Sequence, residues 1–377
     1  DFIIDITIDS EPLGVNDNTT ATCSDVAFNY DLQANINGVG NNVNSDFLWV
    51  ATSNTFVTGE SVIPQAGDFI TDILTNNTTN SNQVVIYTVT PTGINGCKGN
   101  TFTIDVTVYP EPRGVNQTIN TCSDVALSYS LQNNINSVGN NLPATFTWVA
   151  TNNPNVAGET TTPQLSATIT DNITNVSGLV QTVIYTVTPV SDDANTCVGN
   201  DFIITVTVDP EPKGVASIDN VCSDVALSHN LQNDITNSIA STFTWEERTP
   251  YNTFVSGASQ SSQSTSVIND VITNVTGVDQ VVVYDVIPTD AGTACVGDLF
   301  TVTVTVKSEP VGSFDTDAEC SDVALSYDLQ NNITANNGVV STFSWIAADN
   351  ANTIGESLVA KSGSIINDIV TNVYFHN

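Results

Sequence analysis

The sequence predicts an all-β chain in which one antiparallel β-sandwich domain is repeated in tandem. Two observations carry this prediction. Cys-Ser-Asp-Val-Ala recurs at Cys23, Cys122, Cys222 and Cys320, at spacings of 99, 100 and 98 residues. Within each interval, large apolar residues alternate with small or polar ones, which is typical of half-buried strands. A period of this length is too long for one turn of a solenoid and fits a small autonomous domain.

Other features keep the same period and set the domain boundaries. A tryptophan recurs at Trp49, Trp148, Trp245 and Trp345, and a second cysteine recurs at Cys97, Cys197 and Cys295. Glu-Pro-Xaa-Gly closes each unit, at Glu11, Glu111, Glu211 and Glu309. We therefore divide the chain into residues 1–12 (the last strand of a preceding repeat), 13–112 (repeat 1), 113–212 (repeat 2), 213–310 (repeat 3) and 311–377 (repeat 4, incomplete).

Repeat 2 illustrates the predicted strands. Residues 125–131 alternate with a period of two, which favours a strand, although Ser123 and Asp124 could instead cap a helix. Residues 145–149 and 201–208 alternate in the same way, and residues 181–188 are β-rich on both faces, as expected of a central strand. Short segments around Val115, Val156 and Ile169 complete about seven strands in about 100 residues, which is typical of an immunoglobulin-like sandwich.

The two ends of the chain allow two interpretations. Residues 1–8 match residues 201–208, the last strand of repeat 2, and the sequence stops before the two terminal strands expected of repeat 4. A segment of a longer array is the favoured explanation. The alternative is strand donation between neighbouring subunits of a fibre, in which one strand would be supplied where two are missing.

Composition excludes several classes of function. Forty acidic and six basic residues give a formal net charge of −34, so the chain lacks the cations that neutralise phosphates in a nucleic-acid complex. No apolar run reaches the roughly 18 residues of a membrane span. We find no nucleophile elbow, phosphate loop, dinucleotide fingerprint or Cys/His nucleophile arrangement, and the recurrent carboxylates are copied into every repeat, unlike a catalytic pair. The sequence therefore predicts no enzyme.

The seven cysteines predict one disulfide within each complete repeat. The pairs are Cys23 with Cys97, Cys122 with Cys197, and Cys222 with Cys295, and Cys320 is left without a partner. This pairing requires that the strands after the two cysteines run parallel at one edge of the sandwich, so that their beginnings meet. Metal binding is the alternative, but the chain has no Cys-Xaa-Xaa-Cys pair and only two histidines. Disulfides indicate an oxidising compartment outside the cytoplasm.

The recurrent aromatic and acidic residues have structural and functional interpretations. The tryptophans and the tyrosines Tyr87, Tyr185 and Tyr284 are expected in the core, and a carbohydrate-stacking platform is the alternative for the tryptophans. The repeated aspartates are expected to bind backbone N–H groups in turns. No cofactor is required, but calcium at the junctions between repeats is a further possibility. Its candidate ligands are Glu111, Asp124, Glu211 and Asp224.

Several motifs in register resemble a known family. Cys-Ser-Asp-Val-Ala-Leu, Phe-Thr-Trp, Ile-Xaa-Asp-Xaa-Ile-Thr-Asn, Val-Ile-Tyr-Thr-Val-Thr-Pro and Cys-Val-Gly-Asn-Xaa-Phe, with a Pro-Glu-Pro tail, resemble the PKD-like immunoglobulin repeats of large surface proteins in the Bacteroidota. The resemblance covers nearly the whole chain and extends to gliding-motility adhesins exported by type IX secretion. It implies a stalk or filament role at the bacterial cell surface and no catalysis, and it assigns no ligand-binding residue.

We therefore expect an extracellular structural segment that gives an adhesin reach and stiffness. Its partners would be further repeats of the same long chain or neighbouring subunits of a fibre. The alternative is a set of weak glycan- or protein-binding modules, in which multiplicity supplies avidity and calcium contributes. The segment Glu246–Tyr251 of repeat 3 departs from its counterparts, so one repeat is a candidate for such a specialised role.

Overall fold

A computed structural model describes residues 2–374 of the chain. It divides the chain into two compact units, Asp1–Asp209 and Pro210–Asn377, which we describe separately. Repeats 1 and 2 lie in the first unit, and repeats 3 and 4 lie in the second. Residues 1 and 375–377, at the outer ends of the first and last predicted segments, lie outside the described residues.

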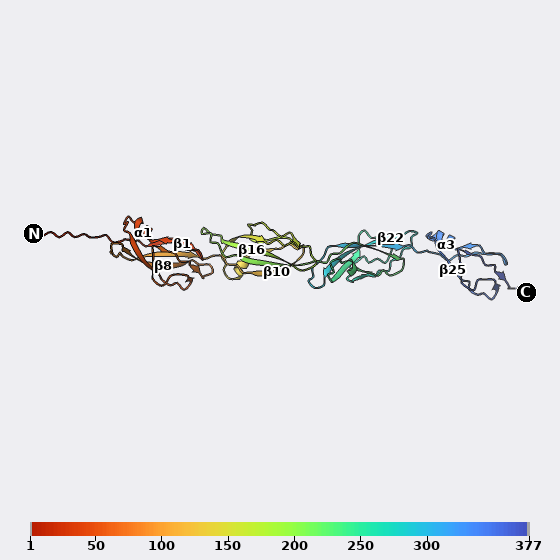
Figure 1. The fold of residues 1–377 in the computed structure, drawn as a ribbon. Coiled ribbons are helices and arrows are strands. Elements are labelled where there is room, and N and C mark those ends of the chain that lie inside the picture. Colours follow the sequence, from red (N-terminus) through yellow and green to blue (C-terminus); the bar gives the residue numbers. More distant parts are fainter. Residues whose placement is uncertain (1, 375–377) are drawn as a thin grey trace. The chain divides into compact units, whose positions relative to one another are not determined.

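Repeat 1 is built on one long sheet, seen in the first part of Figure 1. Its strand order is β1-β9-β8-β3-β5, with β1 (Asp17–Cys23), β9 (Phe102–Tyr109), β8 (Gln83–Gly93), β3 (Ser45–Ala51) and β5 (Gln65–Ala66). Two short strand pairs and a helix complete the repeat: β2 (Tyr30–Asp31) with β6 (Phe69–Ile70), β4 (Val57–Thr58) with β7 (Thr75–Asn76), and α1 (Leu32–Gly38).

Repeat 2 has the same organisation. Its main sheet has the order β10-β17-β16-β12, with β10 (Gln117–Cys122), β17 (Phe202–Asp209), β16 (Gln181–Ser191) and β12 (Ala144–Ala150). Its smaller elements are β11 (Tyr129–Ser130) with β14 (Thr168–Ile169), β13 (Val156–Ala157) with β15 (Thr174–Asn175), and α2 (Leu131–Ser137).

The second unit holds repeats 3 and 4. The main sheet of repeat 3 has the order β18-β23-β22-β20, with β18 (Ser217–Cys222), β23 (Phe300–Lys307), β22 (Gln280–Asp290) and β20 (Ser241–Glu247), beside β19 (His229–Asn230), β21 (Val267–Ile268) and the 3-10 helix η1 (Leu231–Asp234). The described residues of repeat 4 form β24 (Tyr327–Asp328) with β28 (Ile365–Ile366), β25 (Ser344–Trp345) with β27 (Lys361–Ser362), β26 (Thr353–Ile354) with β29 (Thr371–Asn372), and α3 (Leu329–Asn336).

The predicted all-β class with tandem sandwich repeats is confirmed, and β16 is the central strand that the sequence predicts. The core of repeat 2 lies between the main sheet and the layer formed by the helix and the short pairs. Trp148 is 3% exposed, and its ring meets the fully buried ring of Tyr185 edge-on at 5.7 Å between centroids. The same pair recurs as Trp49 with Tyr87 and Trp245 with Tyr284. These aromatic residues are therefore core residues.

The prediction of a strand over residues 125–131 is wrong in part. Only Tyr129 and Ser130 are in a strand, and α2 begins at Leu131. The side chain of Ser130 accepts a hydrogen bond from the backbone N–H of Asn133 and so caps the helix. Leu131 and Ile135 are fully buried one helical turn apart. The asparagines between them are poor helix formers, which hid the helix from a pattern search.

Candidate functional site at the junction of repeats 1 and 2

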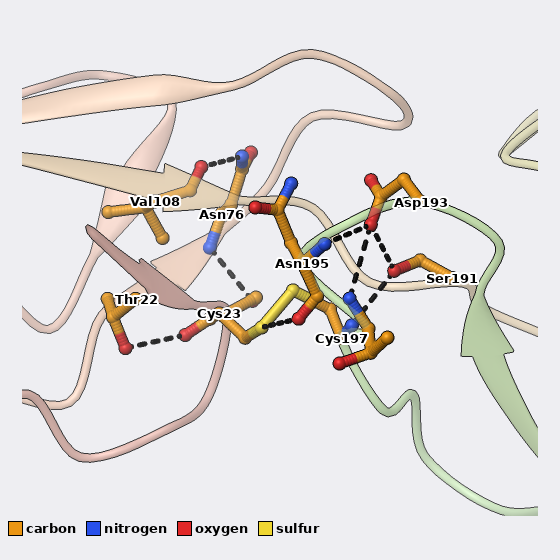
Figure 2. The surroundings of a disulfide bond; sticks show 10 residues. Thr22, Cys23, Asn76, Val108, Ser191, Asp193, Asn195 and Cys197 are labelled. Carbon is orange, nitrogen blue, oxygen red and sulfur yellow. Dashed lines mark hydrogen bonds between the residues drawn. A yellow bond between two sulfur atoms is a disulfide. The ribbon is translucent and has the colours of Figure 1, made fainter.

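A disulfide joins the two repeats of the first unit. Cys23 is the last residue of β1 in repeat 1, and Cys197 lies in the loop before β17 in repeat 2. Their Cα atoms are 5.5 Å apart, and 174 residues of chain separate them. Figure 2 shows the two cysteines meeting from the two repeats, with the carbonyl oxygen of Asn195 3.9 Å from Sγ of Cys23.

This bridge corrects the predicted pairing within each repeat. Cys23 is bonded to Cys197, so neither Cys23–Cys97 nor Cys122–Cys197 forms. The thiols of Cys97, Cys222 and Cys320 are free, so Cys222–Cys295 does not form either. Cys122 and Cys295 are each in a disulfide.

Strand direction explains the correction. The strand that runs parallel to β9 is β1, which ends at Cys23, whereas the sequence analysis placed a parallel strand after this cysteine; Cys23 pairs with Tyr109, the last residue of β9. Cys97, however, precedes the first residue of β9, so the two cysteines of repeat 1 lie at opposite ends of this strand. An eight-residue strand of about 3.3 Å per residue is roughly 25 Å long, several times the reach of a disulfide. Cys97 therefore cannot reach the end of β1, whereas Cys197 of the next repeat does.

The turn after Cys23 is fixed by buried hydrogen bonds. The backbone N–H of Ser24 donates to the carbonyl of Tyr109, and the Ser24 hydroxyl accepts from the backbone N–H of Asn76. The Asn76 side chain, fully buried, donates in turn to the carbonyl of Val108. Asp25 follows with a left-handed φ of 61°, and its carboxylate accepts from the Thr75 hydroxyl. The end of repeat 1 that carries Cys23 is therefore rigid.

The linker between the repeats is buried and held from both sides. Asn140 of repeat 2, 2% exposed, donates its side-chain amide to the carbonyl of Thr79 in repeat 1 at 2.6 Å and to that of Glu111 in the linker at 3.2 Å. Arg113 Nη2 donates to the carbonyl of Asn76 at 2.9 Å. These contacts, together with the disulfide, link the two repeats at several points.

Glu111 places a carboxyl group at the centre of this junction. The residue is 3% exposed, and its Oε1 lies 3.4 Å from Nε of Arg113 without a hydrogen-bond partner among the described residues. Burial raises the pKa of Glu111 to about 7, and the Asp25 carboxylate of repeat 1 adds to this rise, while the Arg113 guanidinium opposes it. The contact between the repeats therefore contains a carboxyl group that titrates near neutral pH.

Comparison with known families identifies the repeats. The model of the PKD-like domain matches residues 20–112, 119–212, 219–310 and 317–375, which is most of the chain. The chain belongs to the PKD-like domain family. A search of curated proteins gives no match.

The PKD-like repeats also align with solved multidomain structures at low identity. A titin I-band fragment, I67–I69, is 9% identical, with 80% of this chain and 100% of that chain covered and a TM-score of 0.30. Mouse cadherin-23 EC22–24 is 10% identical, with 70% and 86% covered and a TM-score of 0.22. The human desmocollin-1 ectodomain is 10% identical, with 86% and 67% covered and a TM-score of 0.24.

The four candidate calcium ligands occupy two kinds of position. Glu111 and Glu211 are buried linker residues, 3% and 7% exposed. Asp124 and Asp224 follow the first cysteine of their repeats and accept hydrogen bonds from the hydroxyls of Thr174 and Thr273, respectively. No group of three or more His, Cys, Asp or Glu side chains suited to a metal ion occurs within residues 2–374. The carboxyl group of Glu111 interacts with Asp25 and Arg113. Calcium binding at the four candidate residues stays a prediction.

The sequence analysis missed the asparagine that holds each linker of the PKD-like array. In the second unit, Asn337 donates to the carbonyls of Val275 in repeat 3 and Glu309 in the linker, as Asn140 does in the first unit. The available signal was Gly-Asn-Asn, which occurs at residues 40–42 and 139–141. It carries no charge and no apolar pattern, and its counterparts in repeats 3 and 4 differ, so only alignment of the repeats would have revealed it.

None of the helices in the described part of the chain is long and apolar enough to cross a bilayer.

Proposed function

We propose that this chain is a structural segment of an extracellular adhesin stalk or filament on a bacterial surface, and that a covalent bridge between repeats 1 and 2 contributes to its stiffness. The observation that carries the proposal is the Cys23–Cys197 disulfide between repeats 1 and 2. A bond of this kind limits the motion of one domain against the next more strongly than a short peptide linker alone.

The junction adds non-covalent resistance to bending. Asn140 and Arg113 each reach from repeat 2 or the linker to a backbone carbonyl of repeat 1, and Pro110 and Pro112 restrict the dihedral angles of the linker between them. In the chain-entropy view, closing a loop of 174 residues also stabilises the bridged pair by roughly 5 kcal/mol. Both effects favour a stiff segment that keeps its length under load.

Small-angle X-ray scattering of the whole chain tests this proposal. Oxidised protein should give an elongated particle with a defined maximum dimension. Addition of a reductant should broaden the distance distribution while circular dichroism stays constant, because each repeat keeps its own core. A compact particle, or a distance distribution that reduction leaves unchanged, would contradict a role in setting reach and stiffness.

A surface location is part of the same proposal. A disulfide is typical of proteins that fold outside the cytoplasm, and the sequence resembles surface repeats of the Bacteroidota. From this resemblance we also infer export by type IX secretion and a connection with gliding motility. Antibody labelling of intact cells tests the location, and loss of the label in a type IX secretion mutant tests the route.

Multivalent binding of glycans or proteins is the second candidate, favoured by the segment Glu246–Tyr251 of repeat 3. Arg248 is paired with Asp285 at 2.6 Å, and Phe254, which follows the segment in the sequence, is 67% exposed. Aromatic side chains contribute much of the binding energy at many interfaces. A glycan array with the whole chain tests this candidate, with and without calcium, and Phe254→Ala serves as the matched variant. Binding that is absent, or unchanged in the variant, would count against it.

A further inference from the structure

The loop that carries Cys97 in repeat 1 is built like the loop that carries Cys197 in repeat 2. The carbonyl of Cys97 accepts from the backbone N–H of Gly93, and that of Cys197 accepts from Ser191, each at 2.8 Å. Gly99 lies against the carbonyl of Pro12 as closely as Gly199 lies against that of Pro112, where no side chain would fit. The segment that precedes each repeat therefore docks on its second-cysteine loop in the same way.

The docked segment brings a strand end to Cys97. The carbonyl of Asp9 lies 3.9 Å from Sγ of Cys97, and Asn95 donates to the carbonyl of Ser10 at 3.2 Å. In the alignment of the repeats, Asp9 corresponds to Tyr109, the residue that pairs with Cys23. Cys97 thus lies beside the position at which, one repeat later, the bridging cysteine is held.

The residues before Asp9 have the pattern of a last strand but no cover in this structure. Phe2, Ile4, Ile6 and Ile8 are 89%, 70%, 79% and 90% exposed. Their counterparts in β17, Phe202, Ile204, Val206 and Val208, are at most 2% exposed because the rest of repeat 2 packs on them. The body of a PKD-like repeat would bury these four apolar side chains in the same way.

We propose that Cys97 forms a second disulfide between repeats. Its partner is the Cys-Ser-Asp cysteine of a PKD-like repeat that precedes residue 1 in the same chain and has residues 2–9 as its last strand. Two independent observations carry this: the equivalent cysteine of repeat 2 is bonded to a Cys-Ser-Asp cysteine, and the exposed strand supplies the place for the partner repeat. The first cysteine of the preceding repeat then pairs with the second cysteine of repeat 1, as Cys23 of repeat 1 pairs with Cys197 of repeat 2.

The chemistry is ordinary thiol oxidation. The thiols of Cys97 and its partner lose two protons and two electrons as the S–S bond forms, and a small-molecule or enzyme disulfide accepts them and becomes two thiols. Cys97 is half-buried in this structure, whereas Cys197 in its bridge is 1% exposed. We expect Cys97 to become comparably buried when bridged.

Disulfide mapping of the full-length protein from its natural source tests the proposal. The protein is alkylated before lysis, digested without reduction, and analysed by mass spectrometry. The expected result is the Cys97 peptide joined to a peptide that contains a Cys-Ser-Asp sequence from before residue 1. An alkylated Cys97 would overturn the proposal, and so would a bond to Cys23. A bond to Cys222 or Cys320 would also overturn it.

Thiol titration of the denatured full-length protein gives a second readout. Replacing a bridged cysteine releases its partner, so Cys97→Ser should raise the number of free thiols by one per chain. Cys197→Ser is the matched control and should also raise it by one, because Cys23 is released. If Cys97 is a free thiol in the full-length protein, Cys97→Ser lowers the number by one, and the proposal fails. The proposal does not depend on the stalk function, since both readouts concern bonding alone.

Discussion

The bridge between repeats 1 and 2 should shield most of the first unit from a pulling force. When the ends of this unit are pulled, tension passes from Cys23 through the disulfide to Cys197, and the residues between them carry none. Replacing Cys23 with serine should remove this short path and let both repeats extend. The unit is best produced alone, as residues 1–209, with Cys122→Ser so that no other bridge competes.

The expected difference in length follows from the sequence separation. The bridge encloses 174 residues, and an extended chain spans at most about 3.6 Å per residue, so cleavage of the bridge should add roughly 600 Å to the fully stretched length. With the bridge intact, only the 35 or so residues outside it extend, which gives about 120 Å.

Single-molecule force spectroscopy measures this difference directly. The unit should reach its full length only with Cys23→Ser or after addition of a reductant, and Cys97→Ser is the matched control that should leave the short length unchanged. If Cys97→Ser releases a length of roughly 260 Å, as expected for a closed loop of about 74 residues, the bridge lies within repeat 1 and the reasoning is refuted.

Four further predictions follow from the core and the junction. Because the pKa of Glu111 is raised to about 7 in the folded unit, its contribution to stability is complete below pH 4.5 and is lost as the pH rises through 7. Glu111→Gln should remove this pH dependence of the free energy of unfolding, measured in urea titrations, and should stabilise the unit at pH 8 by about 1–2 kcal/mol. An unchanged pH dependence would exclude Glu111 as its source. Trp148→Ala should destabilise repeat 2 by about 3–5 kcal/mol in denaturant unfolding, and the half-buried Trp345 should cost less when replaced in repeat 4; equal losses would contradict the core assignment. Asn140→Ala removes three hydrogen bonds at the linker and should cost about 1–3 kcal/mol in the same assay, whereas Asn133→Ala, at an exposed residue of α2, should cost almost nothing. If calcium binds at the junctions, a chelator should lower the transition temperature in thermal melting, and an unchanged transition would exclude calcium there.

The periodic features of the sequence predicted the fold well. Alternation in residues 145–149 and 201–208 located β12 and β17, and the recurrence of Trp148 and Tyr185 located the core, because burial of alternate apolar residues leaves a direct trace in the sequence. Helix α2 left no such trace. It is a helix of seven residues whose two buried apolar residues are separated by polar ones, and it is held by its cap and by packing.

The junction was harder to predict because it depends on strand direction. The spacing of Cys23, Cys97 and Cys197 is compatible with a bridge inside a repeat or between repeats, and only the parallel register of β1 and β9 separates the two. Cys23 also ends its strand, where the sequence analysis had placed it before one. Asn140 and Arg113 act through backbone carbonyls of another repeat, and such contacts require the positions of both repeats.

Peptide mapping of the oxidised 377-residue chain without reduction tests the central claim most directly. The account predicts a cross-linked species that joins the peptide of Cys23 to the peptide of Cys197 and that disappears on reduction. A species that joins Cys23 to Cys97 would contradict it, because each repeat would then be closed on itself and no covalent bond would hold it to the next.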